Sequence, residues 1–257
     1  MCIRDRYAKA HGLYVTYSAE DSTRTELNFL IKVFKTVIDS GVDCARIVDT
    51  LGVATPWTIQ KYVKALREEF SNPIEVHCHN DHGMAVANSL AALEAGASVV
   101  SSSLNGLGER AGIAPTEEVI VCLRNFYGIR DFKTEMLFEV CKFIEKITSI
   151  HIPPNKPVTG HFIFCHTSGI HQAAVLRNAL TYEPYPPEMV GRKRSFVIGK
   201  LSGSHAIEAK LREYGVNPSK EKLRKITETV KLISETRRSA LTDEEILKIY
   251  KEVSGEE

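Results

Sequence analysis

The sequence has no long apolar run, no excess of charge of one sign and no closely spaced pair of cysteines. No apolar stretch approaches the roughly 18 residues of a membrane span, and no basic segment followed by an apolar one opens the chain. Lys plus Arg number 33 and Asp plus Glu 32, so no overall charge favours nucleic acid or a membrane surface. The six scattered cysteines lack a CxxC pair, which predicts reduced thiols. We expect a cytoplasmic protein without nucleic-acid or membrane partners.

A repeating strand and helix pattern fills the first half of the chain. With 257 residues and 43% hydrophobic content, the chain can bury a sizeable core. Strand-like runs begin at Leu13, Cys44, Ile74 and Ser98, and helical stretches cover residues 26–40, 55–70, 84–95 and 116–126. A period of about 30 residues predicts a parallel α/β sheet.

Polar residues gather just after each of these strands. The clusters are residues 18–21, 49–50, 77–81 and 105–110. In (β/α) barrels the chemistry sits at the carboxyl ends of the strands, so the four clusters describe one rim of an active site. A barrel needs eight strands, and four are found here. We therefore predict half of a TIM barrel, with parallel edges that folded proteins avoid exposing.

Two histidines separated by one residue end the third strand-like run. Side chains at i and i+2 of a strand share a face, so the imidazoles of His77 and His79 point the same way. With Asp81 following, this is the spacing of metal ligands, although a histidine in a strand is often a core residue. We interpret the pair as a site for one divalent cation.

The regular pattern ends after about residue 130. A helix is expected over residues 133–149, then a rigid extended linker at residues 152–157, which is rich in proline. We predict a partial barrel domain over residues 7–130, a helix, proline-rich linker and subdomain over 131–203, and a charged helical subdomain over 204–257. Residues 1–6 (MCIRDR) can be read back into the codons ATG TGT ATA AGA GAC AGx, which resemble the end of a sequencing-library transposase adapter. We treat these six residues as foreign to the protein, the alternative being an ordinary basic N-terminus.

Three strings in order resemble the isopropylmalate synthase and homocitrate synthase family. They are HCHND at residues 77–81, NGLGERAG at 105–112 and SGIHQ at 168–172. The resemblance covers residues 7 to about 211 and implies a metal-dependent TIM-barrel enzyme that condenses acetyl-CoA with a 2-oxo acid. It also implies an N-terminally truncated member with the C-terminal half of the barrel, and a subdomain at 131–203 that reaches the active site. The resemblance further implies a divalent metal ion (Zn, Mn or Mg) and a homodimer that exchanges subdomains in the full-length enzyme.

The resemblance implies roles for seven residues. The metal ligands are His77 and His79, the catalytic residues are Glu20, His171 and Tyr182, and the substrate-binding residues are Thr50 and Asn105. Without the resemblance, we would interpret Glu20 and Asp21 as an acidic helix N-terminus. Thr50 would equally be a loop residue, and His171 and Tyr182 would be loop packing.

The sequence also departs from the family pattern. The acidic ligand and the arginine expected on a first strand are absent, and Ile113 stands where isopropylmalate synthases carry a metal-contacting Asn. Homocitrate synthases tend to have Gly-Ile at this point, so the departure concerns the product and not the reaction class. Glu109 and Arg110 are expected to form an ion pair. The GKLSG string at residues 199–203 resembles the family's GKxSG stretch, either a site for a CoA phosphate or a connector.

We therefore predict an acyltransferase of leucine or lysine biosynthesis that makes 2-isopropylmalate or homocitrate. One alternative is a lyase of the same superfamily that runs a retro-Claisen cleavage. Such lyases lack the SGIHQ region, so His171 discriminates between the two. The other alternative is that the 257-residue polypeptide is a catalytically inactive fragment that retains metal binding.

Overall fold

The structure is a computed structural model that describes residues 2–255, without the side chain of Cys2. The described chain forms two compact units. Unit 1 contains the residues up to 133 and 141–150, and unit 2 contains 134–140 and those from 151 onward. Cys44, Cys78 and Cys141 are buried, Cys122 and Cys165 are half-buried, and none of these five cysteines forms a disulfide. No helix within residues 2–255 is long and apolar enough to cross a membrane.

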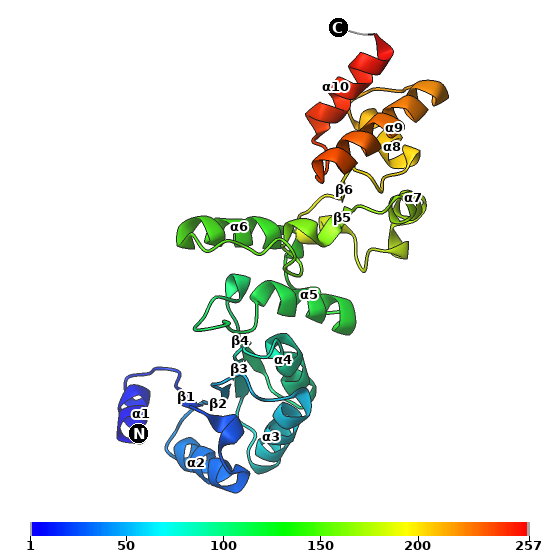
Figure 1. Cartoon of the computed structure of the whole chain (residues 1–257). Helices are drawn as coiled ribbons and strands as arrows, with labels where there is room; N and C mark the ends of the chain where they lie inside the picture. The colour runs from blue at the N-terminus through cyan, green and yellow to red at the C-terminus, as the bar shows by residue number, and fades with distance from the viewer. Residues whose placement is uncertain (1, 256–257) are drawn as a thin grey trace. The chain divides into compact units, whose positions relative to one another are not determined.

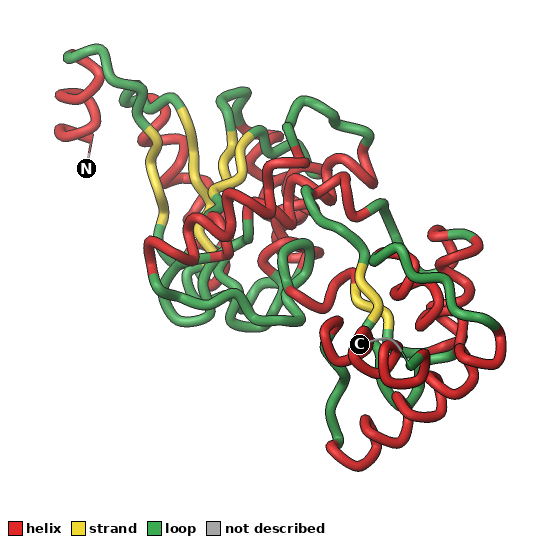
Figure 2. The backbone as a smooth tube through the Cα atoms, turned by 90° about the horizontal axis from the view of Figure 1, so that it is seen from above, coloured by secondary structure: helices red, strands yellow, loops and turns green. Residues whose placement is uncertain are grey.

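Unit 1 is built on a parallel sheet. Its strands are β1 (Thr16–Ala19), β2 (Cys44–Asp49), β3 (Ile74–Cys78) and β4 (Val99–Ser101), hydrogen-bonded in that order. Its helices are α1 (Cys2–Ala10), α2 (Leu27–Asp39), α3 (Pro56–Glu69), α4 (Ala85–Glu94) and α5 (Thr116–Tyr127), with short 3-10 turns η1 (Ser22–Arg24) and η2 (Leu104–Gly106). Figure 2 shows the strands lying side by side. The parallel α/β prediction is confirmed.

The two faces of this sheet differ in character. Because side chains alternate along a strand, Tyr17, Ile47 and Val76 point to one face, where they join the core formed with α2, α3 and α4. Figure 1 shows these helices following one another along the sheet. The other face carries Arg46 and His77 at half-buried positions. A barrel fold uses that face as its interior, and in residues 2–255 β1 pairs only with β2 and β4 only with β3.

Unit 2 combines a small sheet with a helical bundle. A parallel pair, β5 (Cys165–His166) and β6 (Ser195–Phe196), is accompanied by η4 (His161–Phe164), α7 (Gly169–Arg177), η5 (Ala179–Thr181) and η6 (Pro187–Val190). The helices α8 (Ser204–Glu213), α9 (Lys220–Arg237) and α10 (Asp243–Ser254) follow. Ile198, Ile207, Leu211, Ile226 and Ile246 form a core of their own, each 0–1% exposed.

The segments between and before the sheets refine the expected boundaries. The helix predicted over residues 133–149 is a 3-10 turn, η3 (Thr134–Met136), followed by α6 (Leu137–Thr148). The prediction of a rigid extended linker is wrong, because the chain there forms turns in which Lys156 N–H donates to Pro153 O and Gly160 N–H to Lys156 O. Proline and asparagine together are typical of turns. The helix α1 runs across residues 6 and 7, and the foreign origin of residues 1–6, of which Met1 lies outside the described residues, stays a prediction.

Candidate functional site

His77 and His79 lie together at the carboxyl end of β3. Their Nε2 atoms are 3.2 Å apart, and the rings meet at 72°. The Nδ1 atom of His77 lies 2.9 Å from Oγ of Ser101, its register partner on β4. The Nδ1 atom of His79 is buried and lacks a hydrogen-bond partner in the described chain. The predicted pairing of the two imidazoles on one face is therefore present.

The spacing of the two Nε2 atoms suits a shared cation. A cation held about 2.0–2.1 Å from each of two nitrogens at tetrahedral or octahedral angles places them about 2.9–3.4 Å apart. Burial, the neighbouring His79 and the Arg46 charge lower the pKa of His77, which favours the neutral imidazole that a metal requires. A hydrogen bond from His77 Nδ1–H to Ser101 would leave the Nε2 lone pair for the metal. Across residues 2–255, however, no group of three His, Cys, Asp or Glu side chains has the geometry of a metal site.

A charged layer lies one residue pair below the histidines on the same face. Glu75 is 6% exposed and pairs with Arg46 at 2.8 Å. Arg46 also donates to Ser18 Oγ at 3.2 Å, so the contacts cross three neighbouring strands. Because the carboxylate is buried, its pairing avoids the cost of an isolated charge. The pair places balanced charge beneath the His77 ring.

Arg110 joins three of the loops that follow the strands. Its guanidinium donates to both carboxylate oxygens of Asp81, at 2.8 and 2.9 Å, and to Thr50 O at 2.7 Å. The predicted ion pair with Glu109 is a 3.9 Å contact, and the Glu109 side chain is 88% exposed. The main partner of Arg110 is therefore Asp81, whose pKa the hydrogen bonds from Arg110 lower. Thr50 Oγ1 in turn accepts from Asp21 N–H at 2.7 Å, which adds the loop after β1.

The segment around Glu20 differs from the interpretation of Glu20 and Asp21 as an acidic helix N-terminus. Glu20 is exposed directly after β1. Asp21 has a left-handed backbone and pairs with Arg24 at 2.7 Å instead of capping a helix. The cap of α2 is Glu26, whose carboxylate accepts from two backbone N–H groups. Glu20 and Asp21 are therefore not the acidic N-terminus of α2.

Asn105 lies in the loop after β4 with a left-handed backbone, φ 60°. Its Nδ2 donates to Cys141 O at 2.9 Å, and its N–H donates to Glu117 at 3.0 Å. Its Oδ1 is buried and lacks a hydrogen-bond partner in the described residues. The amide thus anchors the loop to α6 and keeps one acceptor for another group.

His171 and Tyr182 face each other in unit 2. Their ring centroids are 4.1 Å apart with the planes tilted by 32°. His171 lies in α7, and Tyr182 ends η5. Both side chains are exposed. The structure therefore brings together the two residues of this region to which the family resemblance gives catalytic roles.

Glu183 follows Tyr182 and is buried, with 4% exposure. Both of its carboxylate oxygens accept from Arg194 at 2.6 Å, and Oε1 lies 3.2 Å from His166 Nε2. Burial alone would raise the pKa of Glu183, but the hydrogen bonds from Arg194 and His166 outweigh it and lower the pKa below 4.5. Sequence inspection missed this residue because its partners are 11 and 17 positions away.

The lowered pKa of Glu183 gives a prediction for acid stability. A carboxyl group with a lower pKa in the folded state stabilises the fold above its unfolded pKa and loses that effect as the pH falls through its folded pKa. The difference in urea midpoint between the unaltered chain and the Glu183→Gln variant should therefore be largest near pH 7 and shrink below about pH 4.5. Urea titrations from pH 3 to pH 7 would measure it. A difference that grows on acidification would contradict the assignment.

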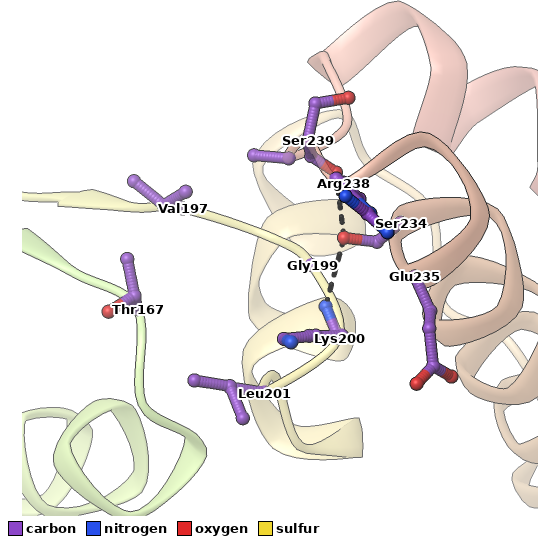
Figure 3. A pocket seen from close by; sticks show the side chains of 10 residues that line it. Thr167, Val197, Gly199, Lys200, Leu201, Ser234, Glu235, Arg238 and Ser239 are labelled. Atoms are coloured by element: carbon purple, nitrogen blue, oxygen red, sulfur yellow. Dashed lines mark hydrogen bonds between the residues drawn. The ribbon is translucent and has the colours of Figure 1, made fainter.

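The GKLSG string borders a cleft of about 590 Å³ in unit 2 (Figure 3). Lys200 N–H donates to Ser234 Oγ at 3.1 Å, and Gly199 N–H to Ser202 Oγ at 3.1 Å. Two N–H groups that a phosphate would use are therefore already satisfied. The string also packs on the SGIHQ region, because a Cβ added at Gly169 would lie 2.9 Å from Leu201 O. These contacts favour a connector over a phosphate site.

Comparison with known proteins gives two successive family matches. Residues 3–144 match the HMGL-like family, and residues 158–238 match the homocitrate synthase post-HMGL domain-like family. The chain is 45% identical to 2-isopropylmalate synthase from Methanocaldococcus jannaschii, over 97% of this chain and 49% of the relative. It is 47% identical to homocitrate synthase AksA from Methanopyrus kandleri, over 96% of this chain and 62% of the relative. The chain thus spans about half to three fifths of the length of these relatives.

A solved structure is also similar. HMG-CoA lyase from Bacillus subtilis superposes with a TM-score of 0.54 and 25% identity, over 59% of this chain and 55% of that one. The length of the match shows that the similarity is not confined to short motifs.

Proposed function

Because the chain belongs to the HMGL-like family, whose members have the TIM-barrel fold, we propose that the whole protein condenses acetyl-CoA with a 2-oxo acid. The acyl group becomes an alkyl group on transfer, so the product is a 2-hydroxy-2-alkyl di- or tricarboxylate. One observation carries the proposal: a single chain joins the HMGL-like sheet, with His77 and His79 at its edge, to the homocitrate synthase post-HMGL region. The second region argues against a lyase.

The His77 and His79 side chains would hold a divalent cation, Zn, Mn or Mg. Their convergent Nε2 atoms, and the contact of His77 Nδ1 with Ser101, fit this role. A bound cation would polarise the ketone of the oxo acid and neutralise the alkoxide that forms. The 257-residue chain supplies two such donors, so we expect it to be inactive by itself. Its alternative role is metal binding without turnover.

The other site residues have separate tasks in this proposal. The Thr50 hydroxyl accepts from Asp21 N–H, which leaves its proton free to donate to the carboxylate of the oxo acid. Asn105 Oδ1 can accept from a substrate hydroxyl. Glu20 would take part in proton transfer, and His171 and Tyr182 would hold or move the proton of the acetyl methyl group or bind the thioester oxygen.

The substrate class follows from the two relatives. The name 2-isopropylmalate implies an oxo acid with an isopropyl side chain, and homocitrate implies one with a carboxyethyl side chain. Ile113, where an Asn is expected for isopropylmalate synthases, inclines the choice towards the second. We place the enzyme in leucine or lysine biosynthesis in the cytoplasm, as a homodimer.

Thiol release from acetyl-CoA tests this function. The upstream reading frame should be restored, and the complete protein assayed with both oxo acids in the presence of each metal. We expect release of CoA with at least one oxo acid, and none from the 257-residue chain. If the complete protein released no CoA with any combination of oxo acid and metal, the synthase proposal would be wrong. Cleavage of HMG-CoA would establish the lyase instead. Turnover by the 257-residue chain would overturn its expected inactivity.

A further inference from the structure

The contact between His171 and Tyr182 needs support from elsewhere in unit 2. Tyr182 is 44% exposed and His171 is exposed as well, so neither ring is enclosed by a core. Their centroid distance of 4.1 Å depends on the positions of two separate backbone segments, α7 and the end of η5. Exposed side chains exchange rotamers rapidly. A lasting contact therefore requires that both backbone segments are fixed.

The residue after His171 fixes the first segment. Gln172 is fully buried, and its Nε2 donates to His166 O at 2.7 Å and to Val197 O at 3.1 Å. His166 belongs to β5, and Val197 directly follows β6. One side-chain amide thus ties the first turn of α7 to both strands of the small sheet.

The residue after Tyr182 fixes the second segment to the same sheet. Glu183 accepts two hydrogen bonds from Arg194, which directly precedes β6, and lies 3.2 Å from the His166 ring. Its backbone N–H donates to Ala179 O at 3.0 Å, a bond between residues four positions apart that joins Glu183 to the start of η5. His166 therefore contacts both anchors, Gln172 through its carbonyl and Glu183 through its ring.

Packing alone does not explain why Gln172 and Glu183 are polar. A buried carboxylate and a buried amide each lose hydration, and apolar side chains of similar volume fill a core without that loss. The Oε1 atom of Gln172 is buried and has no hydrogen-bond partner within residues 2–255. The two polar groups instead fix the positions of their backbone segments, because paired hydrogen bonds are directional.

We propose that Gln172 and Glu183 are positioning residues that hold His171 and Tyr182 face to face through a common anchor in β5 and β6. The hydrogen bonds of Gln172 and Glu183 support the geometric part of this inference, that the two rings are held face to face. Its consequence for turnover rests on the proposed function, in which His171 and Tyr182 act on the acetyl-CoA step. A misplacement of about 1 Å in such groups costs up to about a hundredfold in rate.

The geometric part can be tested on the 257-residue chain. Nuclear Overhauser contacts between the rings of His171 and Tyr182 should be measured in the unaltered chain and in the isosteric variants Glu183→Gln and Gln172→Met. We expect the contact to lose at least half its intensity in each variant, with the melting transition of the fold retained. The exposed Glu235→Gln, in the same unit, is the matched control and should keep the contact. Full contact in both variants would overturn the proposal.

Further variants cover the case in which the fold fails. If Glu183→Gln unfolds unit 2, Arg194→Lys keeps the positive charge but removes the paired geometry. A weakened ring contact in a folded Arg194→Lys protein supports the proposal. Unfolding of that variant too would show that the clamp is a requirement of the fold, and the positioning role would be rejected.

Kinetics of the complete enzyme test the consequence for turnover. Glu183→Gln should lower kcat by about tenfold to a hundredfold while KM for the oxo acid stays unchanged, because the oxo acid is bound by unit 1 residues. If the substitution only reduced the fraction of folded enzyme, Vmax would fall but kcat per folded enzyme would not change. Circular dichroism measures the folded fraction. An unchanged kcat rejects the consequence for turnover. Inactivity of the unaltered complete enzyme would reject the proposed function and leave the ring measurement to decide the geometry.

Discussion

Replacing both His77 and His79 with alanine should abolish the binding of Zn or Mn by the 257-residue chain. The two Nε2 atoms are 3.2 Å apart and belong to one strand end, so in our proposal they chelate one cation together. Loss of an outer hydrogen bond to a ligand typically weakens metal binding about 10–100-fold, so loss of a ligand itself should cost more than about a hundredfold. Isothermal titration calorimetry of the unaltered chain and of the single and double variants measures the effect.

The matched control for this experiment is His82→Ala. His82 lies three residues beyond His79, but its Nδ1 atom contacts Gly52 O at 2.8 Å and does not meet the other two rings. Its removal should leave metal affinity within about twofold. Unchanged uptake of every cation by the double variant, or equal loss in the His82 variant, would mean that the site lies elsewhere.

Gly112→Ala should be among the most destabilising changes of a single methyl group in unit 1. Gly112 has φ +81°, and a Cβ built there would lie 1.9 Å from Gly106 O. This contact is with backbone, which cannot turn away as a side chain can. A strained backbone plus a displaced loop should lower the free energy of unfolding by about 3–5 kcal/mol. Urea denaturation followed by circular dichroism would measure the loss.

Gly83→Ala separates the two causes of that loss. Gly83 also has a left-handed backbone, φ +72°, but a Cβ there meets nothing within 4 Å. Its variant should cost about 1–2 kcal/mol, the price of the left-handed conformation alone. Equal losses in the two variants would show that the close approach to Gly106 does not matter.

The Gly112→Ala substitution should also weaken the proposed metal site. Gly112 O accepts from Asn80 N–H at 2.9 Å, and Ile113 forms a β-bridge with His79. A loop displaced at Gly112 therefore shifts the backbone that carries the second histidine. We expect metal affinity to fall in the Gly112→Ala variant and to be retained in Gly83→Ala. Calorimetry below the melting temperature distinguishes this effect from unfolding.

The ends of the helices could be predicted closely, because capping is a local property. The predicted range 55–70 includes α3 (Pro56–Glu69) and both its caps, with Thr55 accepting from Thr58 N–H and Pro56 in the first turn. The first strand was predicted to begin at Leu13, whereas β1 begins at Thr16. Leu13 is 58% exposed. Apolar character therefore indicated the segment, while hydrogen bonding to β2 decides which of its residues are strand.

The candidate site could be predicted where its spacing is short and not where its contacts are distant. His77 and His79 are two residues apart, so strand geometry alone brings them together. The bond between Asp81 and Arg110 spans 29 positions, and the local sequence does not show which carboxylate Arg110 contacts. The partners of Glu183 are likewise 11 and 17 positions away, so this anchor of Tyr182 became visible only in the folded chain.

The hydrogen bonds of Thr50 and Arg110 also constrain how homologous chains can vary in length. Surface loops usually accept insertions, but one placed beside Thr50 would break a link to Asp21 on one side or to Arg110 on the other. Natural insertions and deletions should therefore be rare in the loop between β2 and α3.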